Sequence, residues 1–358
     1  MKALITAGGR ATRLRPITHT LNKHLIPLAN KPMIFYAIQN ISDIGISDIG
    51  ISVNPGEEEV QKICGDGSKW GVRLTYIEQK GGPLGIAHVV NNARDFLGNE
   101  PFIFYLGDNI ILSGLQRFVD AFEMNDLNCV LALSRVSDPQ RFGVPEIRDG
   151  RIIRVDEKPS QPKSEYAVTG IYVYDSSFFE AFGHIHPSAR GEYEISDVHT
   201  WLIANGYRVG YEEITGWWKD TGKPEDLLHG NDLLLDGLSG QVFENGVRID
   251  AGAIIEGVAV VGQGSHIGSG TILKGPVSIG KNCSMKNAVI GPYVSLSDHV
   301  TIDGAQIERS IVMEGTRISI PEEICDSIFG RNVTAHPSES APPGKRRYLL
   351  GDNAVVHL

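Results

Sequence analysis

Small and basic residues gather directly after the first apolar run of the chain. The run Leu4–Ala7 is followed at once by Gly8 and Gly9, then by Arg13, with Lys23 close behind. A strand that ends in Gly-Gly turns sharply, so its backbone N–H groups can point at an anion, and an arginine adds a fork of donors. The spacing matches neither the dinucleotide fingerprint nor the P-loop. We therefore expect a polyphosphate site here, the alternative being a tight turn with surface arginines.

Two aspartates further along could bind a metal ion. Asp108 follows the apolar run Phe102–Leu106, and Asp220 comes shortly after Trp217 and Trp218. Ligands of open α/β sheets bind at the carboxyl ends of strands, and two carboxylates with phosphate oxygens and waters suit Mg²⁺. A single aspartate is more often a cap or turn residue. Together with a phosphate loop, the pair predicts a Mg²⁺ site.

Polar segments between these aspartates could bind a sugar phosphate. Glu157 and Lys158 are adjacent, Thr169 precedes Gly170, and Arg190 stands in an acidic stretch. Such side chains can hydrogen-bond sugar hydroxyls, and the lysine and arginine can hold a phosphate. Each segment alone would be read as a solvated loop.

Short apolar runs alternate with amphipathic segments up to about residue 230, which predicts α/β units around a mostly parallel sheet. A first helix is expected from Asn30, its cap, through Pro32 in the opening turn to Gly45. The runs expected to form strands are Ala3–Thr6, Ile49–Val53, Leu74–Gln79, Phe102–Leu106, Val130–Ser134 and Gly170–Tyr174.

The C-terminal third repeats with a period of six. Apolar residues stand at Ile249, Ile255, Val261, Ile267, Leu273, Ile279 and Met285, and with occasional five-residue steps the series continues with Ile290, Leu296, Ile302, Ile307, Val312 and Ile318. This period is typical of a parallel β-helix built from hexapeptides, with one inward aliphatic residue per strand. We expect a catalytic domain at 1–239, a β-helix at 240–335 and a tail at 336–358.

Composition excludes several classes of protein. With 33 Lys+Arg against 43 Asp+Glu, the net charge is −10, which disfavours binding to nucleic acid or an anionic membrane. The cysteines at 64, 129, 283 and 325 show no paired spacing and predict buried free thiols in a reducing compartment. The apolar run after Met1 is too short for a signal peptide, and no stretch could span a bilayer. We expect a cytoplasmic protein.

Taken in order, the motifs resemble the sugar-nucleotidyltransferase family, in particular its long-form glucose-1-phosphate thymidylyltransferase branch. The resemblance covers essentially the whole chain. The residues that carry it are Gly8-Gly9-x-x-Thr12-Arg13-Leu14-x-Pro16, Pro83–Ala87, Leu106–Asn109, Phe142–Val144, Glu157–Pro159, Trp218–Gly222 and Arg346–Asn353. It implies a Rossmann-like nucleotidyltransferase domain followed by a left-handed parallel β-helix.

The resemblance also implies an activity: Mg²⁺-dependent, in-line transfer of a nucleotidyl group from dTTP to glucose 1-phosphate, giving dTDP-glucose and pyrophosphate. The implied catalytic residues are Arg13, Lys23, Asp108, Lys158 and Asp220. The implied nucleotide ligands are Gly8, Gly9, Thr12, Arg13, Gln79, Gly85 and Asp108, with Gln79 and Gly85 at the base. The implied sugar-phosphate ligands are Gly143, Glu157, Lys158, Gly170, Arg190 and Trp218, and the metal ligands are Asp108 and Asp220.

Two positions depart from the family's pattern. Ala11 stands where the family usually has glycine, and alanine avoids positive φ. Gln79 precedes Gly85 by six residues, one more than usual.

Alternatives stay open at this point. The nucleotide could be UTP with an aminosugar phosphate, or GTP with mannose 1-phosphate. The β-helix could carry an acyltransferase with His266 or His299 as base. A non-catalytic regulatory subunit is a further alternative, although the charged residues of the site are all present. We also expect self-association into a homo-oligomer.

Overall fold

The computed structural model describes residues 1–9, 11–215, 218–336 and 345–357. The chain forms two compact units, Met1–Gly9 with Ile34–Asp220, and Arg10–Met33 with Thr221–Leu358. The segment Arg10–Met33 therefore belongs to the unit that contains the C-terminal third, which its sequence did not indicate. The predicted domain boundaries after residues 239 and 335 stay predictions.

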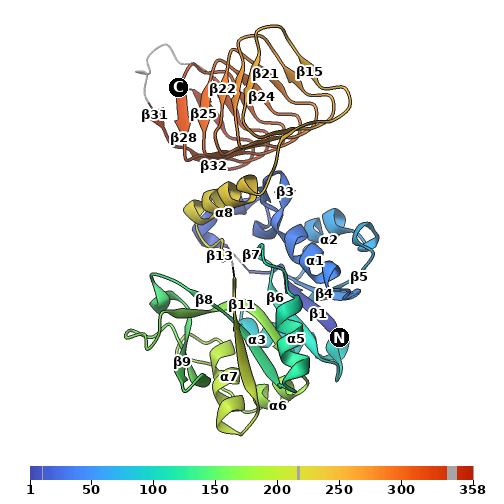
Figure 1. Ribbon diagram of the computed structural model, residues 1–358, viewed down its shortest axis with the longest axis vertical. Coiled ribbons are helices and arrows are strands. Elements are labelled where there is room, and N and C mark those ends of the chain that lie inside the picture. The colour runs from blue at the N-terminus through green and yellow to red at the C-terminus, as the bar shows by residue number, and fades with distance from the viewer. Residues whose placement is uncertain (10, 216–217, 337–344, 358) are drawn as a thin grey trace. The chain divides into compact units, whose positions relative to one another are not determined.

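The first unit is built on a mixed sheet in the order β10-β9-β11-β6-β1-β4-β5, with β8 pairing to β11 and β12 (Figure 1). Each predicted strand is present, but the sheet is less parallel than expected, because β11 runs antiparallel to β6, β8 and β9. The strands are β1 Lys2–Thr6, β4 Asp48–Val53, β5 Arg73–Glu78, β6 Phe102–Leu106, β8 Cys129–Arg135, β9 Gly143–Arg148, β10 Arg151–Glu157, β11 Tyr166–Tyr174 and β12 Val209–Glu213. A separate ribbon pairs β7 Asn109–Ile111 with β13 Trp218–Asp220.

Helices cover the sheet and close its core. Apolar residues of α3, α6 and α7 join those of β6, β8 and β11 in one buried cluster, in which Phe102, Tyr174 and Phe178 are fully enclosed. The helices of this unit are α1 Met33–Asp43, α2 Glu59–Cys64, α3 Ile86–Asn92, α4 Arg94–Leu97, α5 Gln116–Met124, α6 Ser177–Phe182 and α7 Ile195–Ala204, with short 3-10 turns at Ser68–Trp70 and Pro139–Arg141.

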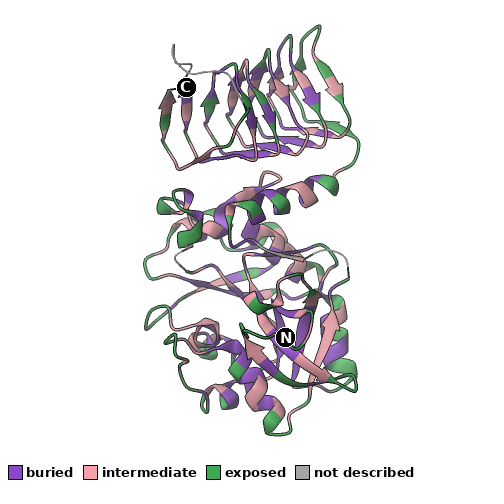
Figure 2. Ribbon diagram, turned by 90° about the vertical axis from the view of Figure 1, so that its left-hand side faces the viewer, coloured by how far each residue is buried: buried purple, intermediate pink, exposed green. Residues whose placement is uncertain are grey.

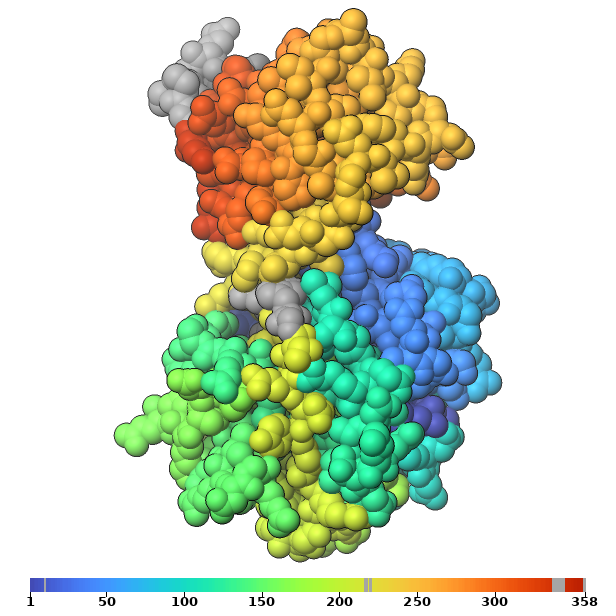
Figure 3. Space-filling model, viewed as in Figure 1, coloured from blue at the N-terminus to red at the C-terminus, as the bar shows by residue number. Residues whose placement is uncertain are grey.

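The second unit contains the predicted β-helix. Within the described residues, β14 to β33 form three parallel sheets, ordered β14-β17-β20-β23-β26-β29-β32, β15-β18-β21-β24-β27-β30-β33 and β16-β19-β22-β25-β28-β31. Successive strands move from one sheet to the next, as in a left-handed parallel β-helix, and the coils stack in chain order (Figures 1 and 3). The predicted fold class is confirmed.

The strands of the β-helix are short. They are β14 Gln241–Phe243, β15 Arg248–Ile249, β16 Ile254–Glu256, β17 Ala259–Val261, β18 His266–Ile267, β19 Ile272–Lys274, β20 Val277–Ile279, β21 Ser284–Lys286, β22 Val289–Ile290, β23 Val294–Leu296, β24 Thr301–Asp303, β25 Gln306–Glu308, β26 Ser310–Val312, β27 Arg317–Ile318, β28 Glu323–Cys325, β29 Ile328–Phe329, β30 Thr334–His336, β31 Lys345–Arg346, β32 Leu349–Leu350 and β33 Val355–His357.

Most of the six-residue series is buried in the core of the β-helix, and Figure 2 shows buried segments recurring along its successive coils. From Val261 to Ile318 every member of the series is at most 2% exposed. Ile249 is 47% exposed, because it belongs to the first coil, which has a neighbouring coil on one side only. The register also reproduces a five-residue step, since His266 pairs with Ser284 but Ser284 pairs with Thr301.

The outer face of the sheet that contains β20 and β23 is covered by α8 (Pro224–Asp236) and by the segment 11–33. That segment holds the turns η1 Thr12–Leu14, η2 Ile17–His19 and η3 Lys23–Leu25 and the hairpin β2 Pro27–Leu28 and β3 Lys31–Pro32. The predicted cap of the first helix is wrong: α1 begins at Met33, and Asn30 has a φ of 63° and donates instead to the backbone oxygen of Ser278.

Candidate active site

The glycine turn follows β1 and contacts two polar side chains of the neighbouring strands. Gly9 donates its N–H to Oδ1 of Asn54 over 2.9 Å, and Asn54 Nδ2 donates back to the Gly9 carbonyl over 3.2 Å. A Cβ at Gly8 would lie 3.1 Å from Asn54 Oδ1 and 3.4 Å from Gln79 Oε1. Gly8, Gly9 and Gln79 are thus neighbours, as predicted for one binding site, and Asn54 is an additional member.

The basic residues of the phosphate motif lie in the second unit. Thr12 and Arg13 are exposed in η1, where the buried Leu14 anchors the turn and Thr18 Oγ1 donates to the Ala11 carbonyl over 2.8 Å. Lys23 is half-buried at the start of η3, and Asn22 caps that turn by accepting the N–H of His24 over 3.0 Å. These hydrogen bonds hold the backbone of both turns.

Ala11 takes the left-handed conformation that its side chain disfavours. Its φ and ψ are 42° and 41°, immediately before η1. The loop therefore keeps a backbone shape suited to glycine, even though alanine occupies the position. A non-glycine residue pays about 1–2 kcal/mol for this conformation.

Gly85 begins α3 with a φ of 95°. A Cβ there would lie 2.6 Å from the carbonyl oxygen of Tyr193, whose N–H in turn bonds the Leu84 carbonyl over 2.7 Å. The ring of Tyr193 stacks on His88, with centroids 6.0 Å apart. Glycine is thus required at this position for both conformation and space.

Asp108 lies just past the carboxyl end of β6, as the sequence predicts. Its Oδ1 accepts a hydrogen bond from Asn109 Nδ2 over 3.0 Å. In the ribbon of β7 and β13, the backbone of Asp220 pairs with Asn109, which brings the main chain of Asp220 beside the residue that follows Asp108. The side chains of Lys219 and Asp220, and the whole of Trp217, lie outside the described residues.

Mg²⁺ prefers carboxylate oxygens as ligands. The carboxylate of Asp108, and the place of Asp220 in the strand pairing opposite Asn109, are therefore compatible with the predicted ion. Within the described part of the chain, no group of three or more His, Cys, Asp or Glu side chains forms a ready-made metal cluster. A Mg²⁺ ion here would therefore complete its shell with ligand oxygens and water.

Asn109 connects three of the predicted site residues. Its Oδ1 accepts the indole N–H of Trp218 over 2.6 Å and the backbone N–H of Gly170 over 3.2 Å, while its Nδ2 donates to Asp108. A Cβ at Gly170 would lie 2.8 Å from Asn109 Cγ, so only glycine allows this approach. Trp218 also meets Phe142 edge to face, with ring centroids 5.6 Å apart.

Glu157, Lys158 and Arg190 form one charged cluster at the end of β10. Glu157 Oε1 lies 3.1 Å from Lys158 Nζ and 3.4 Å from an Arg190 terminal nitrogen. Arg190 also pairs with the buried Glu194 over 2.8 Å. Both cations contact the same oxygen of Glu157, so the cluster brings two positive groups together, and Arg190 also lies 3.7 Å from Glu192.

The rest of the cluster explains its shape. Glu157 pairs with Gly143 across β9 and β10, and Ser196 Oγ donates to Glu157 Oε2 over 3.3 Å. Lys158 has a φ of 45° and donates its N–H to the Phe142 carbonyl over 2.9 Å. Burial raises the pKa of Asp197, and the negative charges of Glu194 and Glu157 raise it further.

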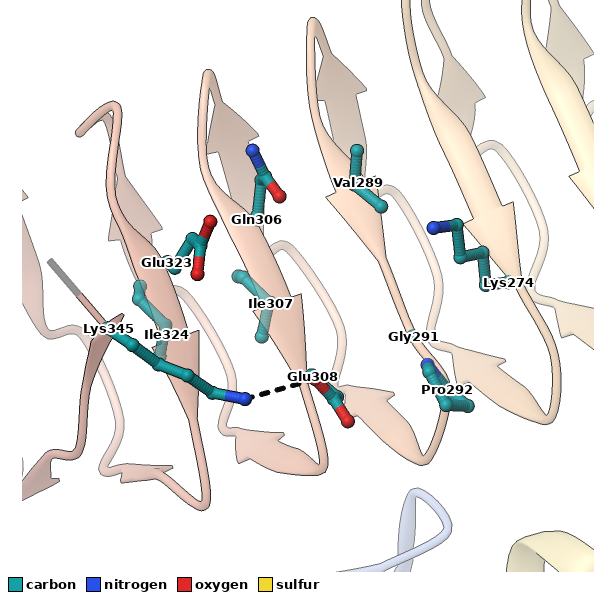
Figure 4. A pocket seen from close by; sticks show the side chains of 10 residues that line it. All are labelled: Lys274, Val289, Gly291, Pro292, Gln306, Ile307, Glu308, Glu323, Ile324 and Lys345. Atoms are coloured by element: carbon teal, nitrogen blue, oxygen red, sulfur yellow. Dashed lines mark hydrogen bonds and ion pairs between the residues drawn. The ribbon is translucent and has the colours of Figure 1, made fainter.

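The β-helix carries a surface pocket and the two histidines named above as candidate bases. Its outer face has a pocket of about 240 Å³ whose charged residues include Lys345 and Glu308, paired over 3.4 Å (Figure 4). His266 Nε2 lies 2.8 Å from Asp250 Oδ1, and His299 is an exposed corner residue. None of the predicted nucleotide or sugar-phosphate ligands lines this pocket.

Two further expectations can be compared with the structure. The cysteines Cys64, Cys129, Cys283 and Cys325 are free in the described chain, and the first three are buried, as predicted. Among the described residues, the helices are all too short or too polar to cross a membrane.

The comparison with protein families decides the assignment. Residues 2–237 match the model of the nucleotidyl transferase family. The chain belongs to this family. The match begins in β1 and ends just after α8, so it includes every predicted site residue of both units.

Other members of the nucleotidyl transferase family match the full chain. The glucose-1-phosphate thymidylyltransferase of Streptomyces antibioticus is 40% identical over 360 residues, covering 100% of this chain and 99% of that one. A low-salt glycan biosynthesis nucleotidyltransferase of Haloferax volcanii is 38% identical over 100% of both chains. A solved Bacillus anthracis structure, described as a glucose-1-phosphate thymidylyltransferase in complex with a sucrose, matches with a TM-score of 0.62 and 40% identity, covering 65% of this chain and 94% of that one.

Sequence reasoning gave no role to two residues that contact the candidate site, Asn54 and Asn109. Asn109 stands next to Asp108 in the sequence, so its position after a buried strand was a usable signal. Asn54 follows β4, the strand beside β1, but nothing in the sequence shows that these strands are neighbours. Only the sheet order brings Asn54 to the glycine turn.

Proposed function

We propose that this nucleotidyl transferase is a glucose-1-phosphate thymidylyltransferase. It would transfer the dTMP group of dTTP to glucose 1-phosphate, releasing pyrophosphate and forming dTDP-glucose. The full-length similarity to the enzyme of that name in Streptomyces antibioticus carries the proposal. The cluster of Glu157, Lys158 and Arg190, with its two cations on one carboxylate, supports it as a site for a sugar phosphate.

On the nucleotide side, we assign the triphosphate to Gly8, Gly9, Thr12, Arg13 and Lys23, and the base to Gln79 and Gly85. Gly9 donates its N–H to Asn54 in the structure, so the loop would exchange that bond for one to a phosphate oxygen on binding. Arginine suits such a role because its planar fork of donors matches phosphate oxygens.

On the sugar side, we assign glucose 1-phosphate to Gly143, Glu157, Lys158, Gly170, Arg190 and Trp218. Glu157 would accept hydrogen bonds from sugar hydroxyls while it orients Lys158 and Arg190 toward the phosphate. Gly170 and Trp218 both donate to Asn109, which keeps their positions fixed relative to each other.

Asp108 and Asp220 are the residues proposed to hold Mg²⁺. The carboxylate of Asp108 follows β6, and the backbone of Asp220 pairs with Asn109. When bound, the ion would supply positive charge to the phosphate oxygens.

The reaction needs no covalent intermediate on the protein. A phosphate oxygen of glucose 1-phosphate would attack the α-phosphorus of dTTP in line, the bond to the bridging oxygen of pyrophosphate would break, and the nucleophile is already an anion. The main obstacle is the repulsion between two anions. Arg13, Lys23 and Lys158 would lower it by neutralising charge and by holding the reactants in line.

The test measures pyrophosphate release with dTTP, UTP, GTP and ATP, each with glucose 1-phosphate, mannose 1-phosphate or glucosamine 1-phosphate, with and without Mg²⁺. We expect dTTP with glucose 1-phosphate to give the highest kcat/KM, and chelation of Mg²⁺ to abolish release. Since dTTP and UTP differ by one methyl group, a preference of about tenfold to 200-fold is the expected range. A higher kcat/KM for another pair would reject the assignment of substrates.

We further propose a catalytic domain at 1–239, a β-helix at 240–335 and a tail at 336–358, and a cytoplasmic homo-oligomer. The free cysteines support a reducing compartment. Sedimentation analysis of the purified chain tests the oligomeric state.

A further inference from the structure

We propose that the last coils of the β-helix position the nucleotide-phosphate segment, through a clamp formed by Thr20, Arg331 and Asp352. This inference rests on the proposed function, because that function assigns Thr12, Arg13 and Lys23 of the segment 11–33 to the nucleotide. The three clamp residues are positioning residues, since they act on the segment and not on the substrate.

The clamp consists of hydrogen bonds between a turn of the segment and two corners of the β-helix. Thr20 follows η2, and its Oγ1 donates to Asp352 Oδ2 over 2.9 Å. A terminal nitrogen of Arg331 donates to the Thr20 carbonyl over 3.3 Å. Both the side chain and the backbone of Thr20 are therefore held by the β-helix.

The two β-helix residues are themselves rigidly placed. Asp352 Oδ1 accepts the backbone N–H of Arg331 over 2.7 Å, and its Oδ2 accepts Arg331 Nε over 2.9 Å. The Asp352 side chain is only 3% exposed, so its charge depends on these donors. Beside them, a Cβ at Gly351 would lie 3.1 Å from the Pro16 carbonyl oxygen, which shows how closely the segment packs on this corner.

The position of Asp352 also occurs at an earlier corner without the clamp. Asp298 follows β23 as Asp352 follows β32, and β23 and β32 belong to the same sheet. Asp298 Oδ1 accepts the backbone N–H of Lys281 over 2.7 Å, just as Asp352 Oδ1 accepts that of Arg331. An aspartate at this corner position is thus a feature of the β-helix itself. At Asp352 its Oδ2 accepts an additional hydrogen bond, from Thr20.

The other end of the segment is anchored as well. Asn30 Nδ2 donates to the Ser278 carbonyl over 2.9 Å, and Ser297 Oγ donates to Asn30 Oδ1 over 3.3 Å. The Ala29 N–H and Ser295 Oγ both donate to Asn231 Oδ1. Lys23 lies between this anchor and the clamp, and Thr12 and Arg13 lie in the turns just before the clamp. Loosening the clamp should therefore disturb the cations more than the fold.

The experiment compares Asp352→Asn and Thr20→Val with the wild-type full-length chain. We expect the KM for dTTP to rise about threefold to tenfold, the effect of losing one such hydrogen bond, with a smaller change in the KM for glucose 1-phosphate. Amide hydrogen exchange of residues 11–26, measured without substrate, should become faster. Thr20→Ser keeps the hydroxyl and should restore wild-type values.

Asp298→Asn is the matched control, because it changes the equivalent corner aspartate. We expect Asp352→Asn to lower Tm more than Asp298→Asn, because it also weakens the buried ion pair with Arg331. The KM for dTTP should rise in Asp352→Asn and stay at the wild-type value in Asp298→Asn. Equal KM values for dTTP in both variants, together with unchanged exchange in 11–26, would overturn the clamp.

The outcomes separate this inference from the proposed function. If the wild-type chain does not use dTTP, the proposed function fails, and the exchange measurement alone still decides whether the clamp orders the segment. If the wild-type chain uses dTTP but the clamp variants match it in KM and exchange, the clamp fails and the function stands.

Discussion

The indole N–H of Trp218 donates to Oδ1 of Asn109 over 2.6 Å, which joins two strands that are far apart in the sequence. The same oxygen accepts the N–H of the buried Gly170. One side chain thus ties the ribbon of β7 and β13 to β11, and it also contacts Asp108. Asn109 therefore connects two residues of the proposed sugar-phosphate site, Gly170 and Trp218, with Asp108.

Replacing Asn109 by alanine should cost stability and sugar-phosphate binding. The change leaves the indole of Trp218 and the N–H of Gly170 without this acceptor, which costs about 1–3 kcal/mol. We expect a lower free energy of unfolding in urea and a raised KM for glucose 1-phosphate. Asn99→Ala, at an exposed position in the turn before β6, is the control and should change neither.

A double-mutant cycle with Trp218→Phe measures the pair directly. Phenylalanine cannot donate a hydrogen bond, so the two substitutions should show a coupling energy of about 0.5–3 kcal/mol. Additive effects would show that the Asn109–Trp218 bond contributes nothing.

Asp108→Asn should reduce kcat about 10²- to 10³-fold, because it removes a charged ligand of the proposed Mg²⁺ site. The fold should be unaffected, since asparagine keeps an oxygen to accept the bond from Asn109 Nδ2. Pyrophosphate release and Tm are measured together, with Asp149→Asn in the exposed β9–β10 turn as control. Near-normal kcat in Asp108→Asn would reject the metal assignment.

Ala11→Gly should stabilise the protein slightly. The φ of 42° costs alanine about 1–2 kcal/mol, and the extra flexibility of glycine in the unfolded chain returns about 0.4–1 kcal/mol of this. The net gain expected is about 1 kcal/mol or less, measured by urea denaturation. The same substitution in a helix, Ala37→Gly, should instead destabilise by about 1 kcal/mol. A loss of stability in Ala11→Gly would show that the turn is not strained.

His199 should make stability depend on pH. It is fully buried in α7, its Nε2 lies 2.6 Å from the Tyr174 hydroxyl, and burial lowers its pKa from 6.5 to about 3. Below pH 6.5 the unfolded chain binds a proton at this residue, but the folded chain does not until the pH approaches 3. This part of the stability is therefore complete above pH 6.5 and is lost as the pH falls.

The measurement is the free energy of unfolding between pH 7 and pH 5. His199 should make the free energy of unfolding depend on pH with a slope of up to about 1.4 kcal/mol per pH unit. His199→Gln should remove this slope, even if the variant is itself more or less stable than the wild type. An equal slope in wild type and His199→Gln would contradict the lowered pKa.

Local patterns were enough to predict much of the molecule. The six-residue period alone predicts the β-helix, because an inward side chain in each short strand must be apolar wherever coils stack on both sides. Likewise, the apolar runs predict β1, β4, β5, β6, β8 and β11, since buried strands require such runs. The order of the motifs predicts the family, which the comparisons confirm.

Tertiary structure decided what depends on contacts between distant segments. The sheet order decides how β11 runs relative to its neighbours and which residues it brings together. It places Asn54 beside Gly9, and it brings Asn109 within hydrogen-bond distance of Gly170. Asparagine often caps helices, yet Asn30 donates a hydrogen bond to the Ser278 carbonyl instead. In the same way, Thr20 donates a hydrogen bond to Asp352. A polar side chain takes whichever partner the fold brings within reach, and sequence spacing does not contain that information. The chain by itself therefore determined its elements and its family, whereas the partners of its polar residues were set only by folding.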